Sequence, residues 1–255
     1  MSSSGQESIE AIILKKNVFS ESNEIVTMYS RELGKVRGVA RAIKKLQSKL
    51  AFGLQQLFYS RIEIVDRRKR LTIIGAKPLE TFKNMRERRQ AVHAALYAAE
   101  LVLKSTADEQ PNQELFDYFL KFLKHLDRSE EPEHQCYNFF GWHVLALTGY
   151  KVDPKICVVC SRPLNSENPI FFSNRKSGFV CHLCAPKVSD LKKINLKIYQ
   201  FFAEATENPE DFVAQDHLFS DQQNRADLRS EVQTLASSFI EFILERELKS
   251  ARYLV

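Results

Sequence analysis

Two closely spaced pairs of cysteines are the most constraining feature of this 255-residue chain. The first pair, CVVC, contains Cys157 and Cys160, and the second, CHLC, contains Cys181 and Cys184. Pairs of this spacing, separated by about 15–20 residues, supply the ligands of four-cysteine structural zinc sites, where each pair lies on a tight turn. The spacing therefore predicts that these four thiols hold one structural Zn²⁺ ion.

The residues between the two pairs have the pattern of a ribbon. Ile170 to Phe172 read as a strand, 174–178 as a turn, and Phe179 with Val180 as the returning strand. Four thiolates leave no open position for water or substrate, so a catalytic zinc is not expected. An iron–sulfur cluster or paired disulfides also suit four thiols, and the sequence leaves both open. His182 lies inside the second pair, and we expect it to point to solvent.

Positive charge is concentrated in the first third of the chain. Residues 1–89 contain 19 Lys and Arg against 9 Asp and Glu, whereas residues 90–255 contain 18 against 23. No apolar run approaches the roughly 18 residues needed to cross a bilayer, and the Ser-rich start lacks the apolar core of a secretory signal. We therefore expect a soluble protein of the reducing cytoplasm, where cysteines bind metal rather than form disulfides.

Five short runs rich in β-branched and aromatic residues lie between Ile9 and about Ile74. They read IEAIILKK, EIVTMYS, GKVRGVAR, LFYSRIEIVD and RLTIIGAK. So many short strands in so short a segment predict a small closed antiparallel barrel, with the OB-fold as the leading candidate. Residues 42–50 between the third and fourth runs are expected to form a longer loop that is mobile or partly helical.

From Thr81 onward the apolar residues recur every three or four positions, which indicates helices. The sequence therefore predicts an α+β protein. Its parts are a small antiparallel β-barrel (OB-fold) over 1–80 and an α-helical domain over 81–255, into which a four-cysteine zinc ribbon is inserted over 153–187. The helices are expected over 83–103, around 115–123, and over 132–148, 191–205 and 221–249.

Basic residues without acidic neighbours mark a candidate nucleic-acid surface. Between Leu33 and Ile62 there are seven basic residues and no acidic one, which favours a polyanionic partner over an ordinary solvated face. Phe52, Phe58 and Tyr59 are close in sequence and offer surfaces on which bases can stack. Two further basic clusters also suit a solubilising turn and a helix end. The residues predicted to bind DNA are Lys35, Arg37, Arg41, Lys44, Lys45, Lys49 and Arg61, then Arg67, Arg68, Lys69 and Arg70, and finally Arg86, Arg88 and Arg89.

Sequence motifs of common enzymes are absent from the chain. It contains no GxxxxGK[ST] loop, GxGxxG turn, HExxH helix or GxSxG elbow. No catalytic residue is predicted, and the protein is not expected to be an enzyme.

Two stretches resemble the RecO family of bacterial recombination mediators. IILKKNVFSESNEIVTMYSRELGKVRGVAR is similar to that family's first barrel strands and basic loop, and LTGYKVDPKICVVC to its helix end leading into the first cysteine pair. The resemblance is clear over 9–186, whereas the C-terminal helices match only in pattern. The family often has Gly where this chain has Ala42, and not every member has the four cysteines that are present here.

The resemblance implies a non-enzymatic role in DNA repair in the bacterial cytoplasm, associated with the nucleoid. Such a protein would bind single- and double-stranded DNA and anneal complementary strands. It would contact the C-terminal tail of single-strand-binding protein and, with RecR, help RecA to load onto coated DNA. The residues by themselves support only the DNA contact. Considered without the resemblance, the residues also allow a second function, that of a zinc-ribbon RNA-binding or transcription-associated OB-fold protein.

Overall fold

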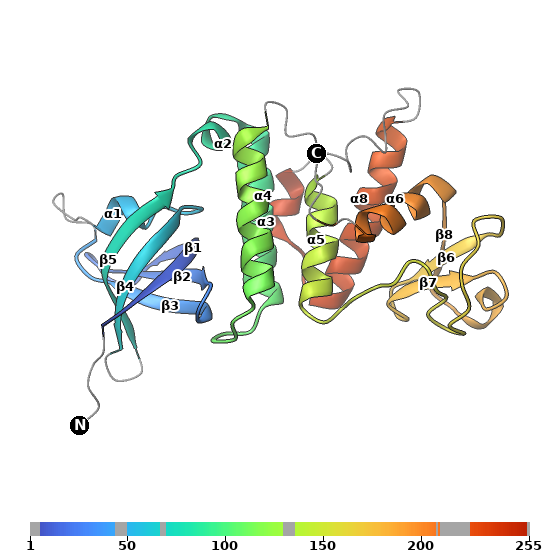
Figure 1. The fold of residues 1–255 in the computed structure, drawn as a ribbon, viewed down its shortest axis with the longest axis horizontal. Helices are drawn as coiled ribbons and strands as arrows, with labels where there is room; N and C mark the ends of the chain where they lie inside the picture. The colour runs from blue at the N-terminus through green and yellow to red at the C-terminus, as the bar shows by residue number, and fades with distance from the viewer. Residues whose placement is uncertain are drawn as a thin grey trace. The chain divides into compact units, whose positions relative to one another are not determined.

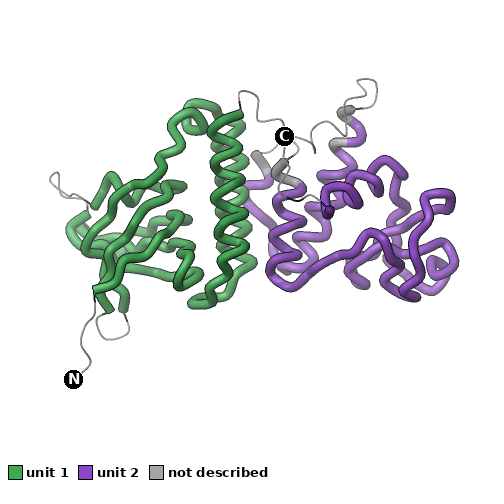
Figure 2. The backbone as a smooth tube through the Cα atoms, viewed as in Figure 1, with its two compact units in different colours: residues 1–130, 254 green, residues 131–253, 255 purple. Residues whose placement is uncertain are grey.

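The structure is a computed structural model that describes residues 6–43, 50–66, 70–129, 136–207, 209 and 225–253 (Figure 1). It divides into two compact units, residues 1–130 with 254 and residues 131–253 with 255 (Figure 2). The barrel and the first helices thus share one unit, and the domain boundary expected at residue 80 stays a prediction. No helix in the described ranges has the length and apolar character needed to span a bilayer.

Five strands of the first unit form a closed barrel, as the sequence predicted (Figure 1). Around the barrel they follow the order β1-β2-β3-β5-β4, and β1 pairs with β4 to close it. The pairing of β3 with β5 is parallel, and all other pairings are antiparallel. This is the topology of the OB-fold. The strands are β1 (Gln6–Val18), β2 (Glu24–Ser30), β3 (Gly34–Ala40), β4 (Tyr59–Asp66) and β5 (Leu71–Glu80), and the short helix α1 (Leu50–Gly53) precedes β4.

Alternating apolar residues fill the barrel. Ile9, Ala11 and Ile13 on β1 are buried, as are Ile62 and Ile64 on β4. Each large aliphatic side chain buried in this way contributes about 1.5–3 kcal/mol relative to exposure. On β4 the intervening residues Arg61 and Glu63 are exposed, whereas on β1 the intervening Ile12 is also buried.

Three helices complete the first unit: α2 (Lys83–Glu87), α3 (Arg89–Ser105) and α4 (Gln113–Arg128). The single helix predicted over 83–103 is therefore wrong, because Arg88 interrupts it with an extended backbone, φ −114° and ψ 111°. The guanidinium of Arg88 donates to the carbonyl oxygens of Leu126 and Ser129 at the end of α4. Carbonyl groups at the end of a helix have no N–H partner within the helix. The interruption at Arg88 places its guanidinium where it can donate to them.

The second unit packs helices and a small sheet around aromatic side chains. Trp142 lies 4.4 Å from Phe202 and 5.2 Å from Phe239, measured between ring centroids, and Phe172 and Phe179 join the same cluster. Its elements are α5 (Cys136–Leu147), β6 (Ile170–Ser173), β7 (Gly178–Cys181), the 3₁₀ turn η1 (Ala185–Lys187), β8 (Leu191–Ile194), α6 (Leu196–Glu207), α8 (Arg225–Leu244) and the 3₁₀ turn η3 (Lys249–Tyr253).

Two predicted helix boundaries in this unit are wrong. The helix expected from residue 191 begins at Leu196, because 191–194 form β8 and pair with β6 of the ribbon. Asn195 then caps the helix, since its Oδ1 accepts from the backbone N–H of Lys197 at 2.9 Å. The last helix ends at Leu244, where Glu245 takes a left-handed conformation with φ 51°, and not at residue 249.

Candidate nucleic-acid interface and metal centre

A groove lies on the outer face of the barrel beside β2, β3 and the start of β5. Its volume is about 410 Å³. It combines apolar, cationic and acidic side chains, and all of them belong to the first unit. The residues that line it are Phe19, Ile25, Lys35, Val36, Arg37, Gly38, Val39, Arg70, Leu71, Asp108 and Glu109.

The turn between β1 and β2 places Phe19 at the groove. The backbone N–H of Phe19 donates to the Asn23 carbonyl at 3.0 Å. The Asn23 side chain donates to Ser20 Oγ at 2.8 Å and accepts from the N–H of Ala42 at 3.0 Å. These bonds fix the turn while the Phe19 ring stays 55% exposed, so a flat aromatic surface is available to a ligand.

Two predicted DNA-binding residues, Arg37 and Arg70, lie together at this groove. Arg37 belongs to β3 and Arg70 directly precedes β5, and the two strands are paired there, since Gly38 of β3 is the register partner of Leu71 on β5. The Arg37 side chain is 63% exposed and forms an ion pair of 3.3 Å with Asp108. Arg70 is exposed and has no ion pair within the described residues. Arg41, just beyond β3, is also exposed.

Lys35 is placed differently from its neighbours. Its residue is 8% exposed, and its amine donates to the carbonyl of Leu103 at 2.9 Å and to that of Thr106. It also pairs with Asp108 at 3.2 Å. The amine therefore anchors the loop between α3 and α4 on β3, and it is not displayed to solvent.

The remaining predicted cations divide between exposed and internal positions. Arg88 is half-buried against the end of α4, and Arg89 is exposed. The guanidinium of Arg86 lies 4.6 Å from the centroid of the Phe58 ring and donates to Gln56 O at 2.5 Å, and burial lowers its pKa. Six further predicted residues, Lys44, Lys45, Lys49, Arg67, Arg68 and Lys69, lie outside the described residues.

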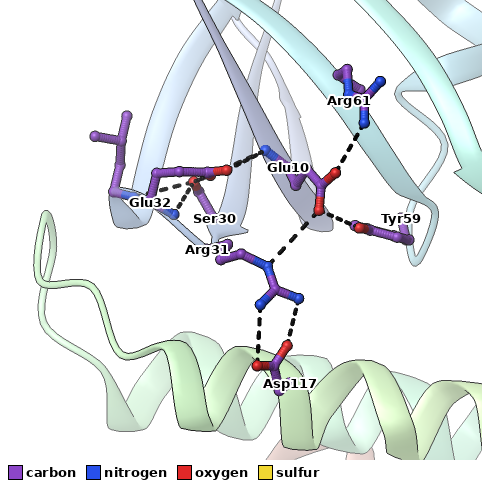
Figure 3. Close-up of polar contacts among 8 residues, drawn as sticks. Glu10, Ser30, Arg31, Glu32, Tyr59, Arg61 and Asp117 are labelled. Carbon is purple, nitrogen blue, oxygen red and sulfur yellow. Dashed lines mark hydrogen bonds and ion pairs between the residues drawn. The ribbon is translucent and has the colours of Figure 1, made fainter.

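Arg61 belongs to a polar network on the barrel surface (Figure 3). Its guanidinium pairs with Glu10 at 3.1 Å, and Glu10 also accepts from the Tyr59 hydroxyl. Arg31 lies 3.8 Å from the same carboxylate and holds Asp117 of α4 through two contacts, 2.5 and 3.1 Å. The Tyr59 hydrogen bond, more than the opposing effect of burial, lowers the pKa of Glu10. This network ties α4 to the barrel within the first unit.

The aromatic residues suggested for base stacking are mostly in the core. Phe58 is 5% exposed and Tyr59 9%, so the prediction that they stack with bases is wrong, whereas Phe52 is exposed. Phe58 instead packs edge-on against Phe52, and Tyr59 packs against Phe116 of α4.

Phe19, the exposed aromatic residue at the groove, was not predicted from the sequence. The sequence signal that could have found it is a phenylalanine directly before the polar run SESN, where the chain leaves the strand and turns.

The four cysteines converge as the spacing predicted. Their Sγ atoms all lie within 4.8 Å of one another, and those of Cys160 and Cys181 are 3.9 Å apart. A tetrahedral zinc site with Zn–S bonds of about 2.3 Å places its sulfurs about 3.8 Å apart. The first pair lies on the turn before the ribbon, the second at the end of β7, and His182 is exposed, as expected.

The protonation of these thiols fits a cation at their centre. Burial opposes ionisation of Cys157, but N–H donors of Cys181, Cys160 and Val159 outweigh it and lower its pKa to about 6. Hydrogen bonding to Cys160, followed by burial, raises the pKa of Cys184 to about 12. Four sulfurs so close together cannot all be negatively charged at low cost unless a cation lies between them. A divalent cation would supply the missing positive charge, and four thiolates suit Zn²⁺.

The fold and the sites define a class of protein: an OB-fold barrel with a cationic, aromatic groove, followed by a helical unit with a four-thiol centre able to hold a metal ion. Comparison with known families identifies the particular one. The family model "Recombination protein O N terminal" matches residues 1–82, and "Recombination protein O C terminal" matches residues 86–252. The chain belongs to the RecO family.

Curated relatives agree with this assignment. A "DNA repair protein RecO" of Dehalococcoides mccartyi is 26% identical over 246 residues, which cover 96% of this chain and 93% of that protein. The protein of the same name from Bacillus subtilis is 30% identical over 178 residues, covering 70% and 68%. That of Syntrophus aciditrophicus is 28% identical over 250 residues, covering 96% and 93%.

Proposed function

We propose that this protein is a non-enzymatic recombination mediator in DNA repair. It binds single- and double-stranded DNA through the basic face of its barrel and anneals complementary strands. With RecR it helps to load RecA onto DNA coated by single-strand-binding protein, whose C-terminal tail it contacts. It acts in the bacterial cytoplasm at the nucleoid. The observation that carries the proposal is the groove in which Arg37, Arg70 and an exposed Phe19 meet in a chain of the RecO family.

The chemistry of the groove suits single strands. Cationic side chains follow the phosphate backbone, and exposed aromatic rings stack with bases of any sequence, each contributing about 1–3 kcal/mol. At the groove Phe19 supplies an exposed ring, and Arg37 and Arg70 supply exposed cations. Phe52 and Arg41 are exposed on the same unit but do not line the groove. We assign the phosphate contacts first to these three arginines, together with the predicted basic residues of 44–49 and 67–69. If about six phosphates are neutralised, log affinity should fall with log salt with a slope of about −4 on single strands.

The four-cysteine centre holds one Zn²⁺ ion in this proposal, and the ion is structural. Cys157, Cys160, Cys181 and Cys184 would be its ligands. The ion would fix the turn before the ribbon to the end of β7, because each pair belongs to one of these segments. Four protein ligands fill a tetrahedral site, so the metal supplies stability rather than chemistry.

Annealing of two complementary labelled oligonucleotides, one coated with single-strand-binding protein, tests the proposed function. Acceleration without nucleotide, weaker at higher salt and with both strands left intact, is the expected result. DNA binding without acceleration would contradict the mediator role, and tighter binding to RNA of the same sequence would then favour the RNA-binding alternative.

Charge-removal variants locate the interface. Joint Arg37→Ala, Arg41→Ala and Arg70→Ala substitutions should make the single-strand salt slope shallower by about 2, since each phosphate contact contributes about 0.7. The matched control removes three exposed cations of the ribbon region, Arg162, Lys176 and Lys187, and should leave the slope near its original value. Equal losses in the two variants would mean that the barrel groove is not the interface.

A further inference from the structure

One end of the barrel groove is acidic. Asp108 and Glu109 line it beside Arg37, although carboxylates repel the phosphates that the arginines attract. A surface that binds only the DNA backbone gains nothing from these groups. The acidic end therefore points to a part of the ligand that carries hydrogen-bond donors and no negative charge.

Backbone contacts between β3 and the loop joining α3 to α4 build this acidic end. Lys35 and Asp108 form a parallel β-bridge, and the N–H of Glu109 donates to the Lys35 carbonyl at 2.9 Å. At Gly34, φ is +69°, and a Cβ atom there would lie 2.1 Å from the Gln110 carbonyl oxygen. Only glycine allows so close an approach. Glu109 itself has φ 59°, a conformation that costs about 1–3 kcal/mol and persists where the surroundings impose it.

The two carboxylates differ in what remains free for a ligand. Asp108 is committed to Lys35 at 3.2 Å and Arg37 at 3.3 Å, so its charge is neutralised within the protein. Glu109 is exposed, and the part of the chain that the structure describes places no cation within ion-pair distance of its carboxylate. Its two oxygens are therefore acceptors for donors brought by the ligand.

We propose that the groove takes one unstacked base of single-stranded DNA and that Glu109 selects guanine there. Guanine presents two adjacent donors, N1–H and the N2 amine, which match the two oxygens of a carboxylate. Adenine and cytosine present one amine beside an acceptor, and the single imino donor of thymine lies between two carbonyls. Phe19 stacks on the base while Arg37 and Arg70 hold the flanking phosphates. The inference rests on the proposed function and adds a base preference to it.

The size and position of the groove agree with a single nucleoside. A volume of about 410 Å³ is at the lower end of the roughly 300–1,000 Å³ typical of ligand pockets and is far too small for a duplex. The arginines and Glu109 line the same groove, so a nucleotide bound there would have both cationic and carboxylate groups beside it.

Fluorescence anisotropy with thymidine oligonucleotides that carry one central dG, dI, dA or dC tests the proposal. Inosine lacks only the N2 amine of guanine, so the unmodified protein should bind the dG oligonucleotide about fivefold more tightly than the dI one, the loss of about one hydrogen bond. Glu109→Gln should bind dG and dI equally, because its amide offers one acceptor in place of two. The control Glu7→Gln, an exposed β1 residue outside the groove, should keep the preference.

The comparison of dG with dI needs no variant, so misfolding of Glu109→Gln cannot obscure the result. Equal binding of dG and dI by the unmodified protein would overturn the base preference and leave the proposed function standing. An equal gain in affinity for every oligonucleotide with Glu109→Gln would show that a phosphate occupies the acidic end, and would also overturn it. Absence of single-strand binding altogether would overturn the proposed function itself.

Discussion

Lys35 and Asp108 form an ion pair of 3.2 Å that fastens the loop between α3 and α4 to strand β3. The Lys35 side chain is 10% exposed, while that of Arg37, which pairs with the same carboxylate, is 63% exposed. Two cations on one face of one strand thus have different environments. The loop covers Lys35 and leaves Arg37 at the open groove.

This difference predicts that Lys35 contributes mainly to stability, whereas Arg37 contributes mainly to DNA affinity. Lys35→Met should lower the free energy of unfolding by about 1–3 kcal/mol, because it leaves the Leu103 and Thr106 carbonyls without a donor. Arg37→Met should change stability little, since its ion pair is exposed, and should weaken single-strand binding. Urea denaturation and anisotropy on the same preparations check both effects. An Arg37 variant that unfolds as easily as the Lys35 variant would contradict the assignment.

The conformation of Ala42 predicts a stabilising substitution. Its φ of 53° is in the left-handed region, which costs a residue with a Cβ about 1–2 kcal/mol. Ala42→Gly removes that cost but adds about 0.4–1 kcal/mol of chain entropy to the unfolded state. The net gain should be about 0.5–1 kcal/mol, measured as a higher urea midpoint. Ala40→Gly, at a buried position of β3 without positive φ, should shift the midpoint the opposite way.

The polar network around Glu10 predicts a pH dependence (Figure 3). The Tyr59 hydrogen bond, with Arg61 and Arg31, lowers the pKa of Glu10 in the folded protein, so the ionised carboxylate stabilises the fold. That stability is present above the unfolded value, about 4.3, and is lost as pH falls through the lower folded pKa. Glu10→Gln should therefore be less stable than the unmodified protein near neutral pH.

The difference between the two proteins should then shrink in the acid range. Denaturation midpoints measured across a series of pH values check this, with Glu7→Gln on the same strand as the control for loss of an exposed charge. A difference that stays constant down to acid pH would show that Glu10 acts by packing alone.

Local patterns predicted the barrel and the metal centre well. The five runs are short, rich in β-branched and aromatic residues and separated by turn residues, and each of them falls on one strand of the barrel. The cysteine spacing similarly determines which four Sγ atoms converge, because each pair lies on one turn. These features depend on residues close together in the chain.

Features that depend on distant residues were not predictable. Arg88 breaks a helix because it meets the end of α4, about 40 positions away, and Lys35 is buried because the loop at Asp108 covers it. Residues 191–194 read as a helix start, yet they pair with β6. In each case a tertiary contact outweighs the local pattern, and a single sequence carries no signal of that contact.

The four-thiol centre predicts that metal and stability are lost together. Cys157 is fully buried. Its Sγ accepts a hydrogen bond from the backbone N–H of Cys181 at 3.4 Å, so it is in contact with the second cysteine pair. Cys157→Ser should abolish zinc retention, because a neutral hydroxyl is a poor ligand for Zn²⁺. The melting temperature should fall by about 5–10 °C, equivalent to a few kcal/mol for a chain of this size.

Atomic emission after gel filtration measures the metal, and thermal denaturation measures stability. His182→Ala is the matched control, since His182 is exposed beside the cluster and outside the four-thiol group, and it should keep both. A chelator should lower the melting temperature of the unmodified protein to that of Cys157→Ser. An unchanged melting temperature in a metal-free variant would remove the structural role, because a metal that stabilises the ribbon cannot leave without loss of stability. Iron in the purified protein would favour an iron–sulfur cluster instead.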